Sequence, residues 1–340
     1  MASLDTPAEY ALSAGEIAEL ETLLEGLRDI DVAPTSTRFY DTLWTAAEEL
    51  PRGLRTFLVE FRRTEPAASC LVHGFPVDDA VIGPTPANWE LAGESKTTRD
   101  QEILLGLCGL VLGEPFTWAT LQAGSLVQNI LPIQGDERRQ SGHGSETLLE
   151  FHTEDGFHPR RCDYLMLLGM RNHDRVPTIL SSVRDIRLDD RDREILSQRR
   201  FHIVPDDEHV RQLAERAPDH PALREAQLML ERPEPVAILF GHRLNPYLRI
   251  DLPFTRCADG DTEARRAVRN LMSELERVQQ DVAVGPGSLL VVDNHLAVHG
   301  RRPFQVRYDG TDRWLKKLTV SRNLRPGYSD RDADDHRVLF

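Results

Sequence analysis

Short apolar runs separated by turn residues fill the chain from residue 115 onward, and they constrain its fold more than any other feature. Helical segments do not alternate with these runs as they would in a parallel sheet of βα units. The pattern favours a mainly β fold with flanking helices, whose core is a double-stranded β-helix, that is, a cupin-like jelly roll. The runs are 124–132, 148–154, 163–169, 178–183, 235–240, 246–251, 287–293 and 314–321.

Helical patterns flank these runs, and we expect residues 1–340 to form a single domain. Residues 1–114 are predicted to contain a helical outer layer and the first strands, and residues 115–325 the jelly-roll core. The insert at about 206–233 is acidic and contains several prolines, which is the composition of a lid. Residues 326–340 are expected to form a C-terminal tail.

Several helices have recognisable boundaries in the sequence. Ser13 and Glu16 have the spacing of a capping box, and Pro51 is a suitable first residue for another helix. The segment 103–112 is the most apolar of the predicted helices. By contrast, the segment 77–98 is polar and contains prolines, so a loop is predicted there. Two further helices are predicted at 185–199 and 261–281.

The composition limits the partners and the compartment that we expect. Hydrophobic residues make up 40% of the chain and charged residues 28%, as in ordinary globular proteins. The formal net charge of −14 argues against a nucleic-acid partner, because phosphate backbones are bound by basic patches. The four cysteines form no CxxC pair, and we find neither a secretion leader nor an apolar run of about 18 residues. We therefore expect a cytoplasmic protein without disulfides or membrane contact, and its oligomeric state stays open.

The first candidate chemistry lies in the run 148–154. His152 and Glu154 are two residues apart, so both side chains leave the same face of an extended strand. A histidine from a later strand would complete a facial set of two imidazoles and one carboxylate, which is the arrangement of non-haem Fe(II) oxygenases. His299, which follows the apolar run 289–292, is the best candidate for this third ligand.

The other ten of the twelve histidines are predicted not to bind the metal. His158 lies on an expected turn beyond His152, and His295 would point away from His299 if the strand continued between them.

Arg313 supports the hypothesis of an Fe(II) oxygenase. Arg313 follows His299 by fourteen residues, and its planar guanidinium is suited to bind a carboxylate with two hydrogen bonds. In sites of this kind the anion is the distal carboxylate of 2-oxoglutarate; a surface ion pair is the alternative.

Three motifs resemble those of the clavaminate synthase-like Fe(II)/2-oxoglutarate-dependent oxygenases, in the same order. They are FHTED at 151–155, VDNHLAVHGR at 292–301 and YDGTDRWL at 308–315, and the similarity extends from about residue 50 to 320. Within that family the chain is most similar to hydroxylases of free amino acids, namely the viomycin-pathway arginine β-hydroxylase, the enduracididine β-hydroxylase and the asparagine oxygenase. The resemblance implies a single oxygenase domain.

Carried over by motif, the family's functional residues fall on positions of this sequence. His152, Glu154 and His299 would bind Fe(II), and Arg313 would pair with 2-oxoglutarate. Thr178 falls where the family places a hydroxyl on the same cosubstrate, and O2 is the second cosubstrate. Glu154 points to hydroxylation or desaturation, because halogenating relatives lack this carboxylate to make room for halide.

The resemblance also implies contacts with the substrate. Gln128 and Glu154 match positions near the substrate α-amino group, and Lys317 replaces the arginine that holds the α-carboxylate in the arginine enzyme. Asp251 matches the acid that meets the side-chain head group, and a carboxylate there suits a guanidinium, an ammonium or an amide. Pro253 stands where the arginine enzyme has a second acid, a departure that weakens the arginine assignment.

Two acids of the predicted lid compensate for this departure if they face the pocket. Asp206 matches a family acid near the head group, and Glu208 stands where the arginine enzyme has a hydroxyl residue. Their negative charge would favour a cationic substrate. A solvated acidic loop is the alternative interpretation.

The function predicted from these observations is Fe(II)/2-oxoglutarate-dependent hydroxylation of an unactivated carbon of a free L-amino acid with a nitrogen-containing side chain. C3 is favoured over C4 and arginine over other substrates, and the resemblance implies a role in nonribosomal peptide biosynthesis. Lysine, enduracididine, citrulline, asparagine and a carrier-tethered aminoacyl group are alternative substrates, and desaturation is an alternative reaction. From a different class, the chain could be a jelly-roll metal-binding protein without oxygenase activity, or a zinc-dependent hydrolase. Only an oxygenase would consume 2-oxoglutarate in an oxygen-dependent way.

Overall fold

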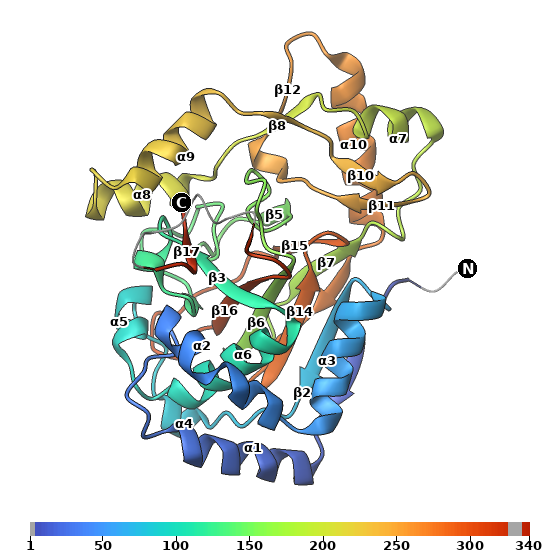
Figure 1. The fold of residues 1–340 in the computed structure, drawn as a ribbon. Coiled ribbons are helices and arrows are strands. Elements are labelled where there is room, and N and C mark those ends of the chain that lie inside the picture. The colour runs from blue at the N-terminus through green and yellow to red at the C-terminus, as the bar shows by residue number, and fades with distance from the viewer. Residues whose placement is uncertain (1–3, 326–334) are drawn as a thin grey trace.

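Two sheets packed face to face form the core of the protein in a computed structural model, which describes residues 4–325 and 335–340 (Figure 1). The larger sheet contains, in spatial order, β1 (Ala8–Ala11), β2 (Ser69–His73), β14 (Ser288–Asp293), β6 (Tyr164–Arg171), β16 (Trp314–Ser321), β3 (Glu114–Trp118) and β17 (Val338–Leu339). A further strand, β4 (Gln128–Ile130), also pairs with β16. The pairings are antiparallel except those of β1 with β2 and of β3 with β17.

The smaller sheet contains three of the predicted site residues, His152, Thr178 and His299. Its order is β13 (Gln280–Val282), β7 (Thr178–Ser182), β15 (Ala297–Arg301) and β5 (Leu149–His152), and all of its pairings are antiparallel. Together the two sheets form the jelly roll that the sequence predicted.

The central strands of the larger sheet are buried on both faces, because each face packs against a different layer. In β6, Leu165 and Leu167 contribute to the core between the two sheets, whereas Tyr164 and Met166 pack in the core beneath the helices. Successive side chains of a strand point to opposite faces. The nearly continuous apolar sequence of β6 therefore serves two cores at once.

Three helices cover the outer face of the larger sheet, namely α1 (Ala14–Leu27), α3 (Arg52–Thr64) and α6 (Arg99–Leu112) (Figure 1). The predicted capping box is present at α1, where Ser13 and Glu16 bond each other's main chain. Between α1 and α3 lie the short helix α2 (Thr37–Leu43) and the 3-10 helix η1 (Trp44–Glu49). The loop prediction for 77–98 is wrong in part, because α4 (Asp79–Ile82) and α5 (Trp89–Glu94) occur there, each with a side-chain cap. These two helices are too short to show the helical spacing of apolar residues in the sequence.

A third group of elements lies at the opposite end of the jelly roll, in the upper part of Figure 1. The predicted lid consists of α8 (Asp207–Arg216) and α9 (Pro221–Glu231). The other elements are α7 (Asp190–Leu196), α10 (Thr262–Arg277), the hairpin of β10 (Leu239–His242) and β11 (Asn245–Leu248), the small sheet of β8 (Phe201–Ile203), β9 (Pro235–Val236) and β12 (Thr255–Cys257), and the 3-10 helix η3 (Leu252–Phe254). A further 3-10 helix, η2 (Gln122–Gly124), lies between β3 and β4 in the chain.

Each of the eight apolar runs contains at least part of a strand, but the sequence missed the pairing strand β15. Its sequence, Ala-Val-His-Gly-Arg, is short and half polar, and a turn at 294–296 separates it from β14. Its strand character depends on two neighbours, β5 and β7, which no local pattern reveals. No helix within 4–325 or 335–340 has both the length and the apolar character needed to cross a bilayer.

Candidate active site

The two histidines of the predicted metal site face each other across neighbouring strands. His152 ends β5 and is the antiparallel partner of His299 in β15. Side chains at directly opposite positions lie on the same face of a sheet, and the two imidazole centroids are 4.2 Å apart. Gly300 permits this close strand pairing, because a Cβ atom there would lie 2.4 Å from the main-chain oxygen of Leu149.

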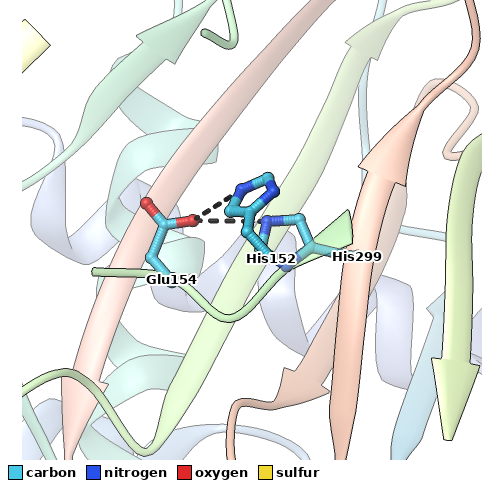
Figure 2. A group of neighbouring side chains, drawn as sticks. All are labelled: His152, Glu154 and His299. Carbon is cyan, nitrogen blue, oxygen red and sulfur yellow. Dashed lines mark ion pairs between the residues drawn. The ribbon is translucent and has the colours of Figure 1, made fainter. Parts of the chain in front are cut away.

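Glu154 completes the cluster from two residues beyond the end of β5. Its Oε2 lies 3.3 Å from Nε2 of His299 and 4.0 Å from Nε2 of His152 (Figure 2). One ligand atom from each of the three residues lies within 4.8 Å of the others. The second carboxylate oxygen, Oε1, accepts a hydrogen bond from the ammonium of Lys317. The carboxylate is thus held by a cation on one side and turned toward both imidazoles on the other.

Protonation and hydrogen bonding prepare these residues for a divalent metal. Nδ1 of His152 lies 2.8 Å from the carbonyl oxygen of Glu150, so a proton there leaves Nε2 free as a donor atom. Burial, and then the neighbouring His299, lower the pKa of His152 to about 4, which keeps it neutral. Burial opposes ionisation of Glu154, yet Lys317 and the two histidines hold its pKa well below the usual range. Two imidazoles and a carboxylate are a donor set that Fe(II) accepts.

A buried cationic corner lies beside the three residues. Arg313 donates from Nη2 to Oγ1 of Thr178 at 3.3 Å, and Arg301 is the residue directly opposite Thr178 across the pair β15 and β7. Burial, and then the guanidinium of Arg301, lower the pKa of Arg313 to about 9. No carboxylate within the described part of the chain forms an ion pair with either guanidinium. An anionic ligand would therefore meet two uncompensated positive charges.

A pair of acids lies on the other side of His152. Asp251 is buried and forms an isolated antiparallel bridge with His152, and Asp206 is the half-buried N-cap of α8. Burial, and then the charges of Asp206 and Glu154, raise the pKa of Asp251 well above its usual value. Burial also raises the pKa of Asp206; the nearby Asp155 adds to this rise, and His209 opposes it. Among residues 4–325 and 335–340, no lysine or arginine is paired with either acid.

Lys317 and Gln128 lie near Glu154, but both have protein partners. Lys317 contacts the carboxylate of Glu154, a contact that the sequence did not predict. Gln128 donates from Nε2 to Oγ1 of Thr117 at 3.0 Å. The positive charge of Lys317 is therefore already paired with Glu154 before a substrate binds.

Glu208 differs from the two aspartates because its charge is compensated. Its Oε2 lies 2.7 Å from Nη2 of Arg211 and 2.8 Å from Nε2 of Gln212. It faces the pocket without adding an unpaired negative charge there. One pocket nevertheless brings together all of the residues that the sequence singled out, namely Gln128, His152, Glu154, Thr178, Asp206, Glu208, Asp251, His299, Arg313 and Lys317.

Comparison with known proteins agrees with this geometry. Residues 110–319 match the family described as taurine catabolism dioxygenase TauD, TfdA family, which covers more than half of the chain. The chain belongs to the TauD/TfdA dioxygenase family. One solved relative is a complex with iron and α-ketoglutaric acid, and the His-Glu-His cluster fits the same cofactors. This dioxygenase therefore depends on Fe(II) and 2-oxoglutarate.

Two curated relatives cover most of this dioxygenase. The enduracididine beta-hydroxylase of Streptomyces hygroscopicus is 40% identical over 97% of this chain and 98% of its own. The L-ornithine/L-arginine 3-hydroxylase of Catenulispora acidiphila is 38% identical over 87% of this chain and 88% of its own. Both are amino acid hydroxylases, as the three sequence motifs led us to expect.

Solved structures of the non-haem iron oxygenase OrfP are similar throughout. The complex with iron, succinate and (3S)-hydroxy-L-Arg has a TM-score of 0.91 and 38% identity, and the alignment covers 98% of this chain and 100% of OrfP. The complex with iron and α-ketoglutaric acid has a TM-score of 0.85 and 37% identity over the same shares. These similarities confirm the jelly-roll dioxygenase fold and its cofactors.

Sequence reasoning missed a residue of this dioxygenase that holds Glu154 by its main chain. Asn294 is fully buried; its Oδ1 accepts from the Glu154 N–H at 2.7 Å, and its Nδ2 donates to the carbonyl oxygen of Glu154 at 3.0 Å. A buried amide that bonds both the main-chain N–H and the main-chain carbonyl of one residue fixes the position of that residue. The one signal in the sequence was an asparagine next to the end of a long apolar strand.

The two expected non-ligand histidines that lie closest in sequence to the ligands have other partners. Nε2 of His295 lies 3.1 Å from Asp163, on the far side of the turn. His158 is buried, with its ring 4.4 Å from that of Trp118. Neither belongs to the group of described residues that could share one metal ion with Glu154.

Proposed function

We propose that the enzyme hydroxylates a free basic L-amino acid, arginine or a close guanidine-containing analogue, at C3. The observation that carries this proposal is the pair of acids, Asp206 and Asp251, neither of which is paired with a lysine or an arginine in the described chain. Carboxylates removed from water are costly unless they are neutralised. A guanidinium brought in by the substrate would supply the missing charge and enough N–H donors for both acids.

The proposal assigns the opposite end of the pocket to iron and 2-oxoglutarate. His152, Glu154 and His299 would hold Fe(II), while Arg313 and Thr178 would bind the distal carboxylate of 2-oxoglutarate. When bound, iron and 2-oxoglutarate supply with O2 an oxidant that can remove hydrogen from an unactivated carbon. The protein's own residues determine which carbon is attacked, because they hold the substrate in one position.

The substrate would lie between the two ends. Asp206 and Asp251 would anchor the head group, and Gln128 on β4 would accept a hydrogen bond from the α-ammonium group through Oε1. Lys317 would bind the α-carboxylate of the substrate and would at the same time hold the carboxylate of Glu154 in place. Fixing both ends of a linear amino acid leaves the carbons between them at defined distances from the metal ligands, which favours one C–H bond over its neighbours.

Two relatives favour basic substrates over neutral ones such as citrulline and asparagine. Enduracididine beta-hydroxylase and L-ornithine/L-arginine 3-hydroxylase, by name, act on amino acids whose side chains end in basic nitrogen, and OrfP binds (3S)-hydroxy-L-Arg. Enduracididine is therefore the second candidate substrate, since its cyclic guanidine carries the same charge. OrfP also binds (3R,4R)-dihydroxy-L-Arg, so C4 is the second candidate position.

We also propose that the whole chain acts as a single cytoplasmic oxygenase domain in specialised metabolism. Free amino acids, ferrous iron and 2-oxoglutarate are all small and soluble, and the enzyme needs no membrane or carrier partner to reach them. A 3-hydroxylated basic amino acid would then serve as a building block of a nonribosomal peptide.

The test is turnover of purified protein with Fe(II), ascorbate, 2-oxoglutarate and air on a panel of free amino acids. The panel contains arginine, enduracididine, ornithine, lysine, citrulline and asparagine. We expect a product heavier by one oxygen atom with arginine or enduracididine, matched by one succinate, and NMR of the product should place the hydroxyl on C3. Efficient conversion of asparagine or citrulline instead would overturn the role given to the two acids, because the side chain of neither substrate carries a cation.

A further inference from the structure

Helix α8 of the lid is attached to the floor of the pocket along one face. Its buried residues Glu208, His209, Gln212 and Leu213 have the spacing of a single helix face. Gln212 accepts the main-chain N–H of Gln122 through Oε1 at 2.8 Å. The position of this helix relative to the pocket therefore depends on a few side chains of its buried face.

His209 makes the attachment closest to the metal ligands. It is 2% exposed, Nδ1 lies 2.6 Å from Oγ1 of Thr120, and Nε2 lies 3.1 Å from Oδ1 of Asp155. The ring of Phe157 packs edge to face against it, with centroids 4.7 Å apart. Because both ring nitrogens and the ring face are engaged, the imidazole has one allowed orientation.

Asp155 connects this contact to the candidate metal centre. It directly follows Glu154 in the chain, and its Oδ2 accepts a hydrogen bond from Nε1 of Trp118 at 2.6 Å. Its φ of 50° lies in the left-handed region, which is uncommon for residues other than glycine although aspartate tolerates it. The lid helix is thus joined to the peptide next to Glu154 through a side chain without freedom to move.

The other end of the connection is Asp206, the acid that caps α8. Oδ1 of Asp206 accepts the main-chain N–H of His209 at 3.2 Å, so the acid and the imidazole belong to the same first helical turn. A displacement of His209 must displace Asp206. Since the head group and the reacting carbon are parts of one substrate molecule, a shift of about 1 Å at the acid would misplace the C–H bond.

We propose that His209 is a positioning residue that fixes Asp206 of the lid relative to Glu154, and thereby couples recognition of the substrate head group to hydroxylation. The inference rests on the proposed function and deepens it. The bonds from His209 to Thr120 and Asp155 set the distance between the two ends of the substrate site.

The test variant is His209→Phe, which keeps an aromatic ring beside Phe157 and removes both hydrogen bonds. We expect KM for arginine to rise about tenfold, as for the loss of one to two buried hydrogen bonds, while KM for 2-oxoglutarate changes less than about twofold. The ratio of succinate to hydroxylated product should rise, because cosubstrate is consumed without a correctly placed carbon. Iron affinity of the apoprotein should stay as in the wild type, and hydrogen exchange of the α8 amides should accelerate.

His220→Ala is the matched control. His220 caps α9, the second helix of the same lid, and does not line the pocket. This variant should leave the succinate-to-product ratio unchanged even if the lid loses stability. Equal uncoupling in both variants would show a general effect of lid stability and overturn the proposal, as would normal coupling in His209→Phe.

The outcome also separates this inference from the proposed function. If the wild-type enzyme converts none of the basic amino acids, the proposed function fails. Hydrogen exchange then still decides whether His209 fastens the lid: faster exchange of α8 in His209→Phe but not in His220→Ala supports the attachment, and equal exchange overturns it.

Discussion

The two ends of the active-site pocket carry opposite charges and come from different parts of the fold. At one end, His152, His299 and Thr178 are placed by the register of three neighbouring strands. At the other end, Asp206 caps a lid helix and Asp251 precedes a 3-10 helix, outside both sheets. Strand register fixes side chains by backbone pairing, whereas loops and lids tolerate change. The first end therefore suits a reaction shared by a family, and the second suits the choice of substrate.

The charges of the two ends explain why each ligand enters in one orientation. Within the described residues, Arg301 and Arg313 lack a carboxylate partner, and Asp206 and Asp251 lack a lysine or arginine partner. A dicarboxylate at the basic end and a guanidinium at the acidic end would each relieve an uncompensated charge that is shielded from water. Exchange of the two ligands would instead place like charges together.

The largest expected effect is the loss of a metal ligand. His299→Ala should reduce both turnover and Fe(II) affinity to below about one hundredth of wild type, since even outer partners of ligands are worth tenfold to a hundredfold. The measurements are succinate formation and iron bound by the purified apoprotein. His295→Ala is the control, because His295 is paired with Asp163 and belongs to neither end. Similar iron binding by both variants would contradict the assigned metal site.

The second prediction sharpens the contrast at the basic end. Arg313→Gln removes charged hydrogen bonds to a carboxylate, so KM for 2-oxoglutarate should rise about a hundredfold while KM for the amino acid changes little. The control is Arg307→Gln, which removes an exposed pair with Asp174 and should cost almost nothing. A selective rise of KM for arginine would mean that the two ends have been assigned the wrong way round.

The third prediction concerns the acidic end and compares two acids that line the same pocket. Asp251→Asn should raise KM for arginine about tenfold to thirtyfold, because an uncompensated charge is lost. Glu208→Gln should have a much smaller effect, since Arg211 and Gln212 already satisfy that carboxylate. Steady-state kinetics with arginine decide the matter, and equal effects would show that both acids meet the head group.

The sequence predicted the basic end better than the acidic end, and the physical reason is periodicity. In a His-x-Glu pair on an extended segment, both side chains lie on the same face. The register of β5 with β15 then places His299 beside them. The residues of the lid follow no such rule. The compensation of Glu208 by Arg211 is an i, i+3 pair that the helix spacing could have revealed. The hydrogen bond between His209 and Asp155 joins residues 54 positions apart, and no pattern in the sequence predicts it.

Other parts of the site were outside the reach of a single sequence because they are tertiary. The sequence predicted that Lys317 would bind the α-carboxylate of a substrate. In the structure its ammonium group instead contacts the carboxylate of Glu154. Asn294 clamps the Glu154 peptide across 140 residues of chain. Both contacts depend on how β16 and the turn after β14 pack around the metal ligands, and packing of that kind leaves no periodic trace.

The smallest expected effect is a difference in pH dependence between the two ends. Burial, and then neighbouring negative charges, raise the pKa of Asp251, and burial raises that of Asp206, so both acids keep their protons to a higher pH than a carboxyl group in water does. The folded state then holds these protons more tightly than the unfolded state, and the ligand-free protein loses this stabilisation as pH rises. Arginine binds the ionised acids. Its KM should therefore fall as pH rises through the raised pKa values of the two acids, and its stabilising shift in Tm should grow over the same range.

The basic end should show no such trend, because a guanidinium stays charged throughout that range. KM for 2-oxoglutarate is expected to be flat, and Asp251→Asn should flatten most of the arginine profile as well. The profiles can be measured in one buffer series at constant ionic strength. Parallel profiles for 2-oxoglutarate and arginine would assign the pH dependence to the metal ligands, and would exclude the two acids as its cause.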